Sequence, residues 1–144
     1  MLSCTLDMKF FVLLLLPLAI NAGLVVEVTV KTACNTNGAD MDEGGIIMTI
    51  VAGGKFCSTG QQLDIPTDQW ESCNEDHYGI DDIGDCKLFD VGEGDVTLLL
   101  THAGGDAWKG EYFDLVLTDG TLRCLTTEWL DEFRQYVVTC QKEY

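Results

Sequence analysis

Acidic side chains are the most numerous groups in this 144-residue sequence that could do chemistry. Asp and Glu number 24 against 8 Lys and Arg, so the formal net charge is −16 at pH 7. The acids gather in short segments at 40–43, 75–85 and 90–95, and at Asp106. Because carboxylate oxygens are the ligands that Ca²⁺ prefers, these segments are candidates for a cation site. In the alternative interpretation, the acids only keep the protein soluble.

The same charge balance disfavours several classes of partner. A protein that binds a nucleic-acid duplex must present Lys and Arg to the phosphates, and this chain has few of either. Simple electrostatic docking on an anionic lipid surface is disfavoured for the same reason. We therefore expect no nucleic-acid partner.

Side chains suited to catalysis are scarce. A hydrolytic site needs a nucleophile, a base and a group that orients the base. His77 and His102 are the only histidines, and no G-x-S-x-G segment occurs. His102 follows an apolar run and is interpreted as a partly buried structural residue, whereas His77 lies among acids and is interpreted as solvated. The sequence therefore predicts a protein that is not an enzyme.

Six of the seven cysteines indicate disulfides. Cys4 lies in an apolar N-terminal segment, and the other six are Cys34, Cys57, Cys73, Cys86, Cys124 and Cys140. An even number of cysteines in a secreted chain predicts three disulfides and leaves their connectivity open. No two cysteines have C-x-x-C spacing, which argues against a zinc ribbon or a redox-active dithiol.

The first residues are typical of a secretory signal. Lys9 precedes an apolar run at 10–20, which is short for a membrane span and right for the central region of a signal peptide. Small residues at 21–23 predict cleavage after Ala22, so residues 1–22 form the signal peptide and 23–144 the secreted, extracellular domain. An N-terminal membrane anchor is the alternative. No later segment is apolar enough for a transmembrane segment.

Apolar residues in the rest of the chain mostly recur with a period of two, which is typical of strands. We expect strands at 26–31, 46–51, 63–65, 86–91, 96–100, 112–117, 122–125 and 134–140, and a loop at 67–84 with at most one short strand near 78–80. Asp119-Gly120 predicts the centre of a hairpin turn, and only Glu128–Phe133 has a pattern for a helical turn. Short strands with frequent glycine turns predict one all-β domain, an antiparallel β-sandwich of seven to eight strands.

The order of motifs resembles that of a PLAT domain, the lipoxygenase-homology β-sandwich. In the second half, the resemblance lies in "GGDAWKGEYFDLVL" at 104–117, "DGT" at 119–121 and "EWL" at 128–130. In the first half, it lies in "VEVTVKT" at 26–32, "NGAD" at 37–40, the run at 46–51 and "DIG" at 82–84. The resemblance covers residues 25 to about 131, although many PLAT domains lack cysteines.

The resemblance implies binding rather than catalysis, with contacts to membranes, lipoproteins or other proteins. In calcium-binding members, the loop after the first strand and the "D-A-W" loop lie together, which implies a Ca²⁺ site made by Gly38, Asp40, Asp106 and Ala107. The Trp residues at 108 and 129 are expected in the core, since both lie where strands begin or end. Trp70 and Tyr78 lie in a polar segment and are the candidate aromatic contacts for a partner.

Three functions are compatible with these features. The first is a secreted, non-enzymatic binding module for a lipid surface, a protein or a glycan, with possible dependence on Ca²⁺. The second is an acidic extracellular-matrix or biomineral-associated protein, whose carboxylates meet Ca²⁺ or mineral directly. The third is a secreted effector or venom component on the same scaffold.

Overall fold

The computed structural model describes residues 23–34, 45–63, 73–103, 107–131 and 134–142, and within them every regular element but one is a strand. The strands are β1 (Val25–Thr32), β2 (Ile46–Ala52), β3 (Lys55–Ser58), β4 (Glu75–Tyr78), β5 (Val96–His102), β6 (Trp108–Leu117), β7 (Gly120–Leu125), β8 (Trp129–Leu130) and β9 (Gln135–Lys142). A single 3₁₀ turn, η1, spans Gly84–Cys86. None of the described elements is a helix long and apolar enough to span a membrane.

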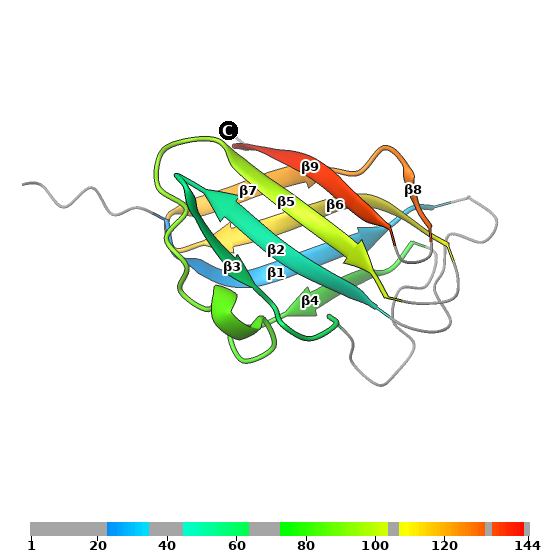
Figure 1. Cartoon of the computed structure of the whole chain (residues 1–144), viewed down its shortest axis with the longest axis horizontal. Helices are drawn as coiled ribbons and strands as arrows, with labels where there is room; N and C mark the ends of the chain where they lie inside the picture. Colours follow the sequence, from blue (N-terminus) through cyan, green and yellow to red (C-terminus); the bar gives the residue numbers. More distant parts are fainter. Residues whose placement is uncertain (1–22, 35–44, 64–72, 104–106, 132–133, 143–144) are drawn as a thin grey trace, which may run out of the picture.

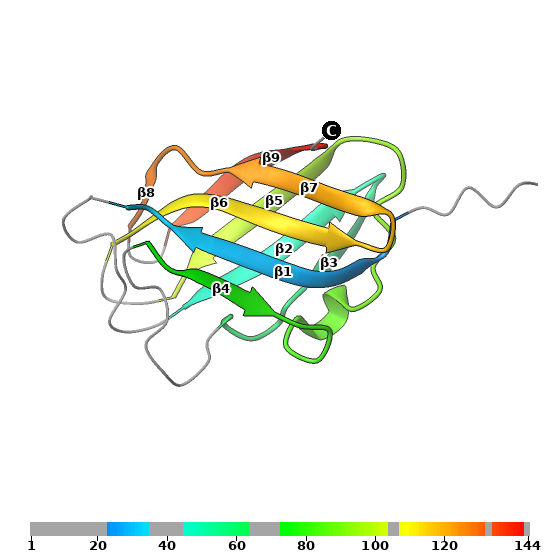
Figure 2. The same ribbon diagram turned by 180° about the vertical axis from the view of Figure 1, so that it is seen from behind.

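The strands form two facing layers that β9 joins (Figures 1 and 2). The strand order is β3-β2-β5-β9-β7-β6-β1-β4, and all pairings are antiparallel. Residues 135–139 of β9 pair with β5, whereas residues 140–142 pair with β7. We call β3, β2, β5 and residues 135–139 of β9 the front sheet, and β7, β6, β1 and β4 the back sheet. The expected antiparallel β-sandwich is confirmed.

The core lies between the two sheets and is built by alternation along each strand. The inward side chains are aliphatic or aromatic and almost fully buried: Val28 and Val30 on β1, Met48 and Ile50 on β2, Leu98 and Leu100 on β5, and Phe113 and Leu115 on β6. Removing this apolar surface from water is the main favourable contribution to folding.

Trp108 is the largest fully buried side chain. Its indole nitrogen donates a hydrogen bond to the Thr32 hydroxyl at 3.1 Å, and its ring meets Phe113 edge-on with centroids 5.7 Å apart. The expectation that Trp108 is a core residue is confirmed. Trp129 is only partly buried, and the Lys109 ammonium lies 5.6 Å from the centroid of its ring.

Three disulfides link the six cysteines as Cys34–Cys73, Cys57–Cys86 and Cys124–Cys140. The first joins the end of β1 to the residues before β4, the second joins β3 to η1, and the third joins β7 to β9. The two longest links close chain segments with sequence separations of 39 and 29 residues. A closed loop restricts the unfolded chain, so each disulfide stabilises the fold by roughly 2–4 kcal/mol.

The structure corrects the expected strand at 86–91. Cys86 is held in the core by its disulfide and ends η1, and Leu88 has a φ of 56°, which an extended strand does not allow. The segment touches the start of β1 only locally: Asp90 forms an isolated bridge to Leu24, and backbone hydrogen bonds join residues 88, 89 and 91 to residues 23–25.

Two local expectations near the end of the chain were also wrong. The β6–β7 hairpin turns at Thr118 and Asp119, because Leu117 already pairs with Gly120. Within the expected helical turn at 128–133, residues 129 and 130 form β8, which pairs with Trp108 and Lys109 of β6; residues 132 and 133 lie outside the described residues. The hairpin register keeps Leu115 opposite Leu122 on the buried side.

We expect Trp108→Ala to lower the free energy of unfolding by about 3–5 kcal/mol, because it empties a fully buried aromatic site. Trp129→Ala serves as the control and is expected to cost less, because that ring is partly exposed. Urea unfolding followed by circular dichroism measures both. An unchanged midpoint for Trp108→Ala would contradict the central position of the indole.

Candidate binding surface

The outer face of the front sheet carries no charged side chain among the described strand residues. Because side chains alternate, the residues between the buried ones point outward. These are Ile47, Thr49 and Val51 on β2, Phe56 and Ser58 on β3, Thr97, Leu99 and Thr101 on β5, and Gln135, Val137 and Thr139 on β9. In a chain with a net charge of −16, a sheet face of hydroxyl, amide and apolar groups alone is an exceptional surface.

The strand register arranges the apolar members of this face into a diagonal stripe. Phe56 lies directly opposite Val51, and Leu99 lies directly opposite Val137. Val51 is opposite Thr97, so it is the diagonal neighbour of Leu99. We call Phe56, Val51, Leu99 and Val137 the apolar stripe. Its members come from β3, β2, β5 and β9, the four strands that lie side by side in the front sheet (Figure 1).

Both ends of the apolar stripe are unusually exposed. Phe56 is 75% exposed and Val137 is 69% exposed, the two highest values among the exposed large hydrophobic residues of the described chain. Leu125 of β7 is also exposed, at 59%, and lies opposite Tyr112 on the outer face of the back sheet. Leu125 and Val137 both line a groove of about 430 Å³ beside β7 and β9.

The strand that carries Phe56 is held in place on its far side. Its neighbour Cys57 is bonded to Cys86, and the Lys55 ammonium lies 5.7 Å from the Phe89 ring centroid and 3.7 Å from the Asp90 carboxylate. These contacts fix β3 against the segment that follows η1. Phe56 is therefore presented by a braced strand, which lowers the entropy cost of binding.

The outer face of the back sheet has the opposite character. Arg123 donates two hydrogen bonds to Asp114, at 2.8 and 2.7 Å, and its guanidinium lies 3.8 Å from the centroid of the Tyr112 ring. The Tyr112 hydroxyl donates to Glu75 at 2.5 Å. Charged groups on this face thus bind one another, and the strongest pair is bidentate.

His77 belongs to the same network. Its Nδ1 lies 2.9 Å from Glu27 and 3.2 Å from the Thr29 hydroxyl, and its Nε2 lies 3.4 Å from Glu75. The sequence indicated a solvated side chain. His77 is half-exposed, but its ring nitrogens contact these side chains. His102, by contrast, is fully buried at the end of β5.

Of the four residues expected to bind Ca²⁺, Gly38, Asp40 and Asp106 lie outside the described residues, and Ala107 is exposed just before β6. The described ends of the two loops do lie side by side, since the Ala33 backbone nitrogen donates to the Lys109 carbonyl at 3.0 Å. Within the described segments, no group of three or more His, Cys, Asp or Glu side chains could hold a metal ion.

Trp70 and Tyr78 were both expected to contact a partner. Trp70 lies outside the described residues. Tyr78 is fully buried in the core, so its assignment as an exposed contact is wrong. Tyr78 of β4 pairs with Val28 of β1, and the alternation that turns His77 outward turns Tyr78 inward.

Sequence reasoning did not find the uncharged face, although a signal for it exists. β2 and β5 contain no Asp, Glu, Lys or Arg at any position. A strand with one wet face normally alternates apolar with polar or charged residues. Two neighbouring strands without charges on either side indicate a sheet whose outer face avoids charge as well.

Glu75 controls the ionisation of Tyr112. The hydrogen bond to Glu75, followed by burial, raises the pKa of Tyr112 to about 12 from its usual 10. An unfolded tyrosine ionises near pH 10, so unfolding releases this proton between about pH 10 and 12, and stability falls as pH rises through that window.

We expect Glu75→Gln to move the pKa of Tyr112 towards 10, because the substitution removes the negative charge beside the hydroxyl. The measurement is tyrosinate absorbance against pH, with Tyr112→Phe subtracted to isolate the one residue. Glu27→Gln is the matched control, because Glu27 contacts His77 and Thr29 rather than Tyr112. A Tyr112 pKa that stays near 12 in Glu75→Gln would contradict the role of Glu75.

Three comparisons with known proteins bear on the fold. No family model matches the chain, and no match is found among curated proteins. Similar solved structures include the alpha toxin from Clostridium absonum, with 20% identity and a TM-score of 0.62 over 82% of this chain and 32% of that chain. The alpha-toxin of an avian Clostridium perfringens strain has 15% identity and a TM-score of 0.59 over the same shares.

A lipoxygenase (LOX) structure in complex with arachidonate matches with 17% identity and a TM-score of 0.62. The match covers 81% of this chain and 16% of that chain. The chain therefore spans about a sixth of the lipoxygenase and about a third of each toxin. These likenesses, together with the antiparallel two-layer topology, confirm that the chain has the PLAT-like β-sandwich fold.

Proposed function

We propose that the protein is a secreted, non-catalytic binding module that docks on a partner protein through the outer face of the front sheet. The observation that carries this proposal is the apolar stripe on an uncharged face of a highly acidic chain. Contiguous apolar surface that a soluble monomer leaves exposed commonly marks an interaction site. The three disulfides support an extracellular, oxidising location.

The chemistry of the face favours a protein over a lipid surface. Five hydroxyl groups stand among the apolar side chains, from Thr49, Ser58, Thr97, Thr101 and Thr139. A hydroxyl moved into hydrocarbon without a hydrogen-bond partner costs roughly 2–7 kcal/mol, whereas a protein partner can supply donors and acceptors. The face also lacks the Lys and Arg that attract anionic headgroups.

Phe56 is the expected anchor of the interface. Among the described residues it is the most exposed large hydrophobic side chain, and full burial of such a side chain contributes about 1.5–3 kcal/mol. Interfaces concentrate their energy in a few such residues, with near-neutral contacts around them. The matrix and mineral alternatives would use the carboxylates instead, so they do not require Phe56 or Val137.

We expect Phe56→Ser combined with Val137→Ser to abolish partner capture while leaving the melting temperature unchanged, because both side chains point into solvent. Leu88→Ser is the matched control, since Leu88 is 47% exposed but lies outside the face. The measurement compares wild type and variants in capturing one and the same extracellular protein, identified by mass spectrometry. Titration of that purified protein by calorimetry then gives the loss of affinity.

Three outcomes would count against this proposal. Equal capture by wild type and the double variant would remove the face from consideration. Binding of the wild type to phosphatidylcholine vesicles, lost in the same double variant, would establish lipid docking instead. Adsorption to calcium mineral that survives the double variant would favour the matrix alternative.

We further propose that the domain binds Ca²⁺ through two loops. The loops that hold Asp40 and Asp106 start from adjacent ends of β1 and β6, as the Ala33–Lys109 hydrogen bond indicates. Extracellular Ca²⁺ sites commonly have dissociation constants of about 10⁻⁴–10⁻³ M. A site of that affinity would stabilise the domain by roughly 1–2 kcal/mol at about 5 mM Ca²⁺.

We therefore expect Ca²⁺ to raise the melting temperature by a few degrees at about 150 mM salt, where diffuse attraction is screened. Mg²⁺ at the same concentration serves as the control ion. The shift is expected to disappear when Asp40→Asn and Asp106→Asn are combined. Equal shifts with both ions, or a shift that survives the double substitution, would exclude these residues as ligands.

A further inference from the structure

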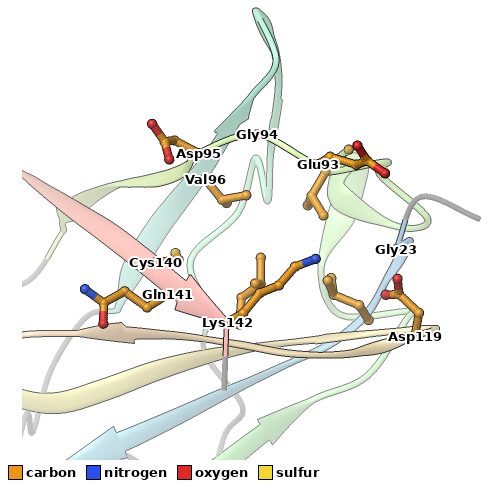
Figure 3. Close-up of a pocket in the computed structure, with 13 residues that line it drawn as sticks. Gly23, Glu93, Gly94, Asp95, Val96, Asp119, Cys140, Gln141 and Lys142 are labelled. Atoms are coloured by element: carbon orange, nitrogen blue, oxygen red, sulfur yellow. The ribbon is translucent and has the colours of Figure 1, made fainter. Parts of the chain in front are cut away.

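A cavity at the β6–β7 turn brings together Gly23 and charged groups from three other segments. Its volume is about 410 Å³, and its lining includes Gly23, the turn at Gly92–Val96, Asp119 and the end of β9. Glu93, Asp95 and Asp119 supply three carboxylates, against the single ammonium of Lys142 (Figure 3). The charged side chains of the lining therefore carry a net negative charge.

Gly23 is fixed in position on both sides. Its carbonyl accepts a hydrogen bond from the Val91 backbone nitrogen at 3.2 Å. The next residue, Leu24, donates from its backbone nitrogen to the Thr118 hydroxyl at 3.1 Å and accepts from the Thr118 nitrogen at 3.0 Å. Gly23 is thus held against the β6–β7 turn, and it is buried.

The Asp119 carboxylate lies directly beside Gly23, as Figure 3 shows. An ideal Cβ on Gly23 would be 2.2 Å from Oδ1 of Asp119 and 2.8 Å from a methyl carbon of Leu117. Since a Cβ lies about 2.5 Å from the backbone nitrogen of its own residue, Oδ1 is within about 4.7 Å of the Gly23 nitrogen. Glycine permits this approach, because a side chain would meet both neighbours.

We propose that this cavity is the seat of the mature N-terminus: cleavage after Ala22 frees an α-ammonium on Gly23, which pairs with Asp119. This inference rests on the secretion that belongs to the proposed function. A signal-peptide protease adds water across the Ala22–Gly23 amide, so that Ala22 keeps a carboxylate and Gly23 gains an amine. That amine, with an ordinary pKa near 8, is protonated at pH 7.

The consequence is an ion pair that only the processed chain can make. Before cleavage, the Gly23 nitrogen is a neutral amide, and Asp119 adds to the excess of carboxylates around the cavity. After cleavage, one positive charge appears on the Gly23 nitrogen beside it. The processed N-terminus then joins the β6–β7 turn electrostatically as well as through the hydrogen bonds of Gly23 and Leu24.

The test compares two chains that differ only ahead of residue 23. One begins at Gly23; the other carries Asn21, Ala22 and a short Gly-Ser spacer upstream, so that the Gly23 nitrogen stays an amide. Each is prepared as wild type, as Asp119→Asn and as Asp85→Asn. Asp85→Asn removes the same charge from the exposed side chain of Asp85 in η1 and serves as the control.

We expect Asp119→Asn to lower the melting temperature of the chain beginning at Gly23 by about 2–4 °C at pH 6.5 and low salt. The same substitution in the extended chain is expected to have no such effect, and high salt is expected to reduce the difference between the two chains. Asp85→Asn should affect both chains equally. An equal effect of Asp119→Asn in both chains would overturn the ion pair.

The N-terminus of the secreted protein provides an independent measurement. The intact mass of the chain secreted by eukaryotic cells is expected to correspond to a first residue at Gly23. A different first residue would overturn the assignment of the cavity to the mature N-terminus. That result would not affect the docking face, which the Phe56 and Val137 variants test on their own, so one proposal can be wrong while the other holds.

Discussion

The architecture depends on β9, which pairs with both layers of the sandwich. Its first five residues continue the front sheet beside β5, and its last three continue the back sheet beside β7. The Cys124–Cys140 disulfide joins two residues that are already cross-strand partners, so covalent bond and register agree. Because side chains alternate along a strand, a slip by one residue would turn Val137 inward and Val138 outward. The composition of the front face therefore follows from this register.

The two outer faces differ in charge. On the back sheet, Arg123, Asp114, Tyr112 and Glu75 bind one another, so little of this charge is left to recruit a ligand. On the front sheet, neither charge nor a network of ion pairs competes with an incoming partner. The contrast arises from strand composition, since β2 and β5 lack charged residues entirely while β1, β4 and β6 contain several.

Most of the fold could be predicted from the sequence, because the strands of the core have a clear period of two. Val28 and Val30 alternate with Glu27, Thr29 and Lys31, a pattern typical of a half-buried strand. The segment at 86–91 was misread because its apolar residues serve a disulfide-held turn, and backbone conformation at Leu88 is invisible in composition. Tyr78 was misread because its polar neighbours suggested a loop.

The candidate binding surface was harder to predict than the fold. A surface is made by registers between strands that are distant in sequence: Phe56 meets Val51 across a tight hairpin, whereas Leu99 meets Val137 across 38 positions of chain. Local patterns do not specify such pairings. The N-terminal cavity has the same origin, since Gly23 and Asp119 become neighbours only when β1 pairs with β6.

The two outermost strands have a consequence for colloidal behaviour. β3 and β4 end the strand order, and an unpaired strand edge is a template on which further chains can polymerise. Both strands are only four residues long, which limits the number of backbone hydrogen bonds that an intruding chain can gain. Each is also tethered covalently, β3 through Cys57 and β4 through Cys73 just before it. The two disulfides thus hold both edge strands in place, which limits the pairing of these edges with other chains for as long as the bonds stay oxidised.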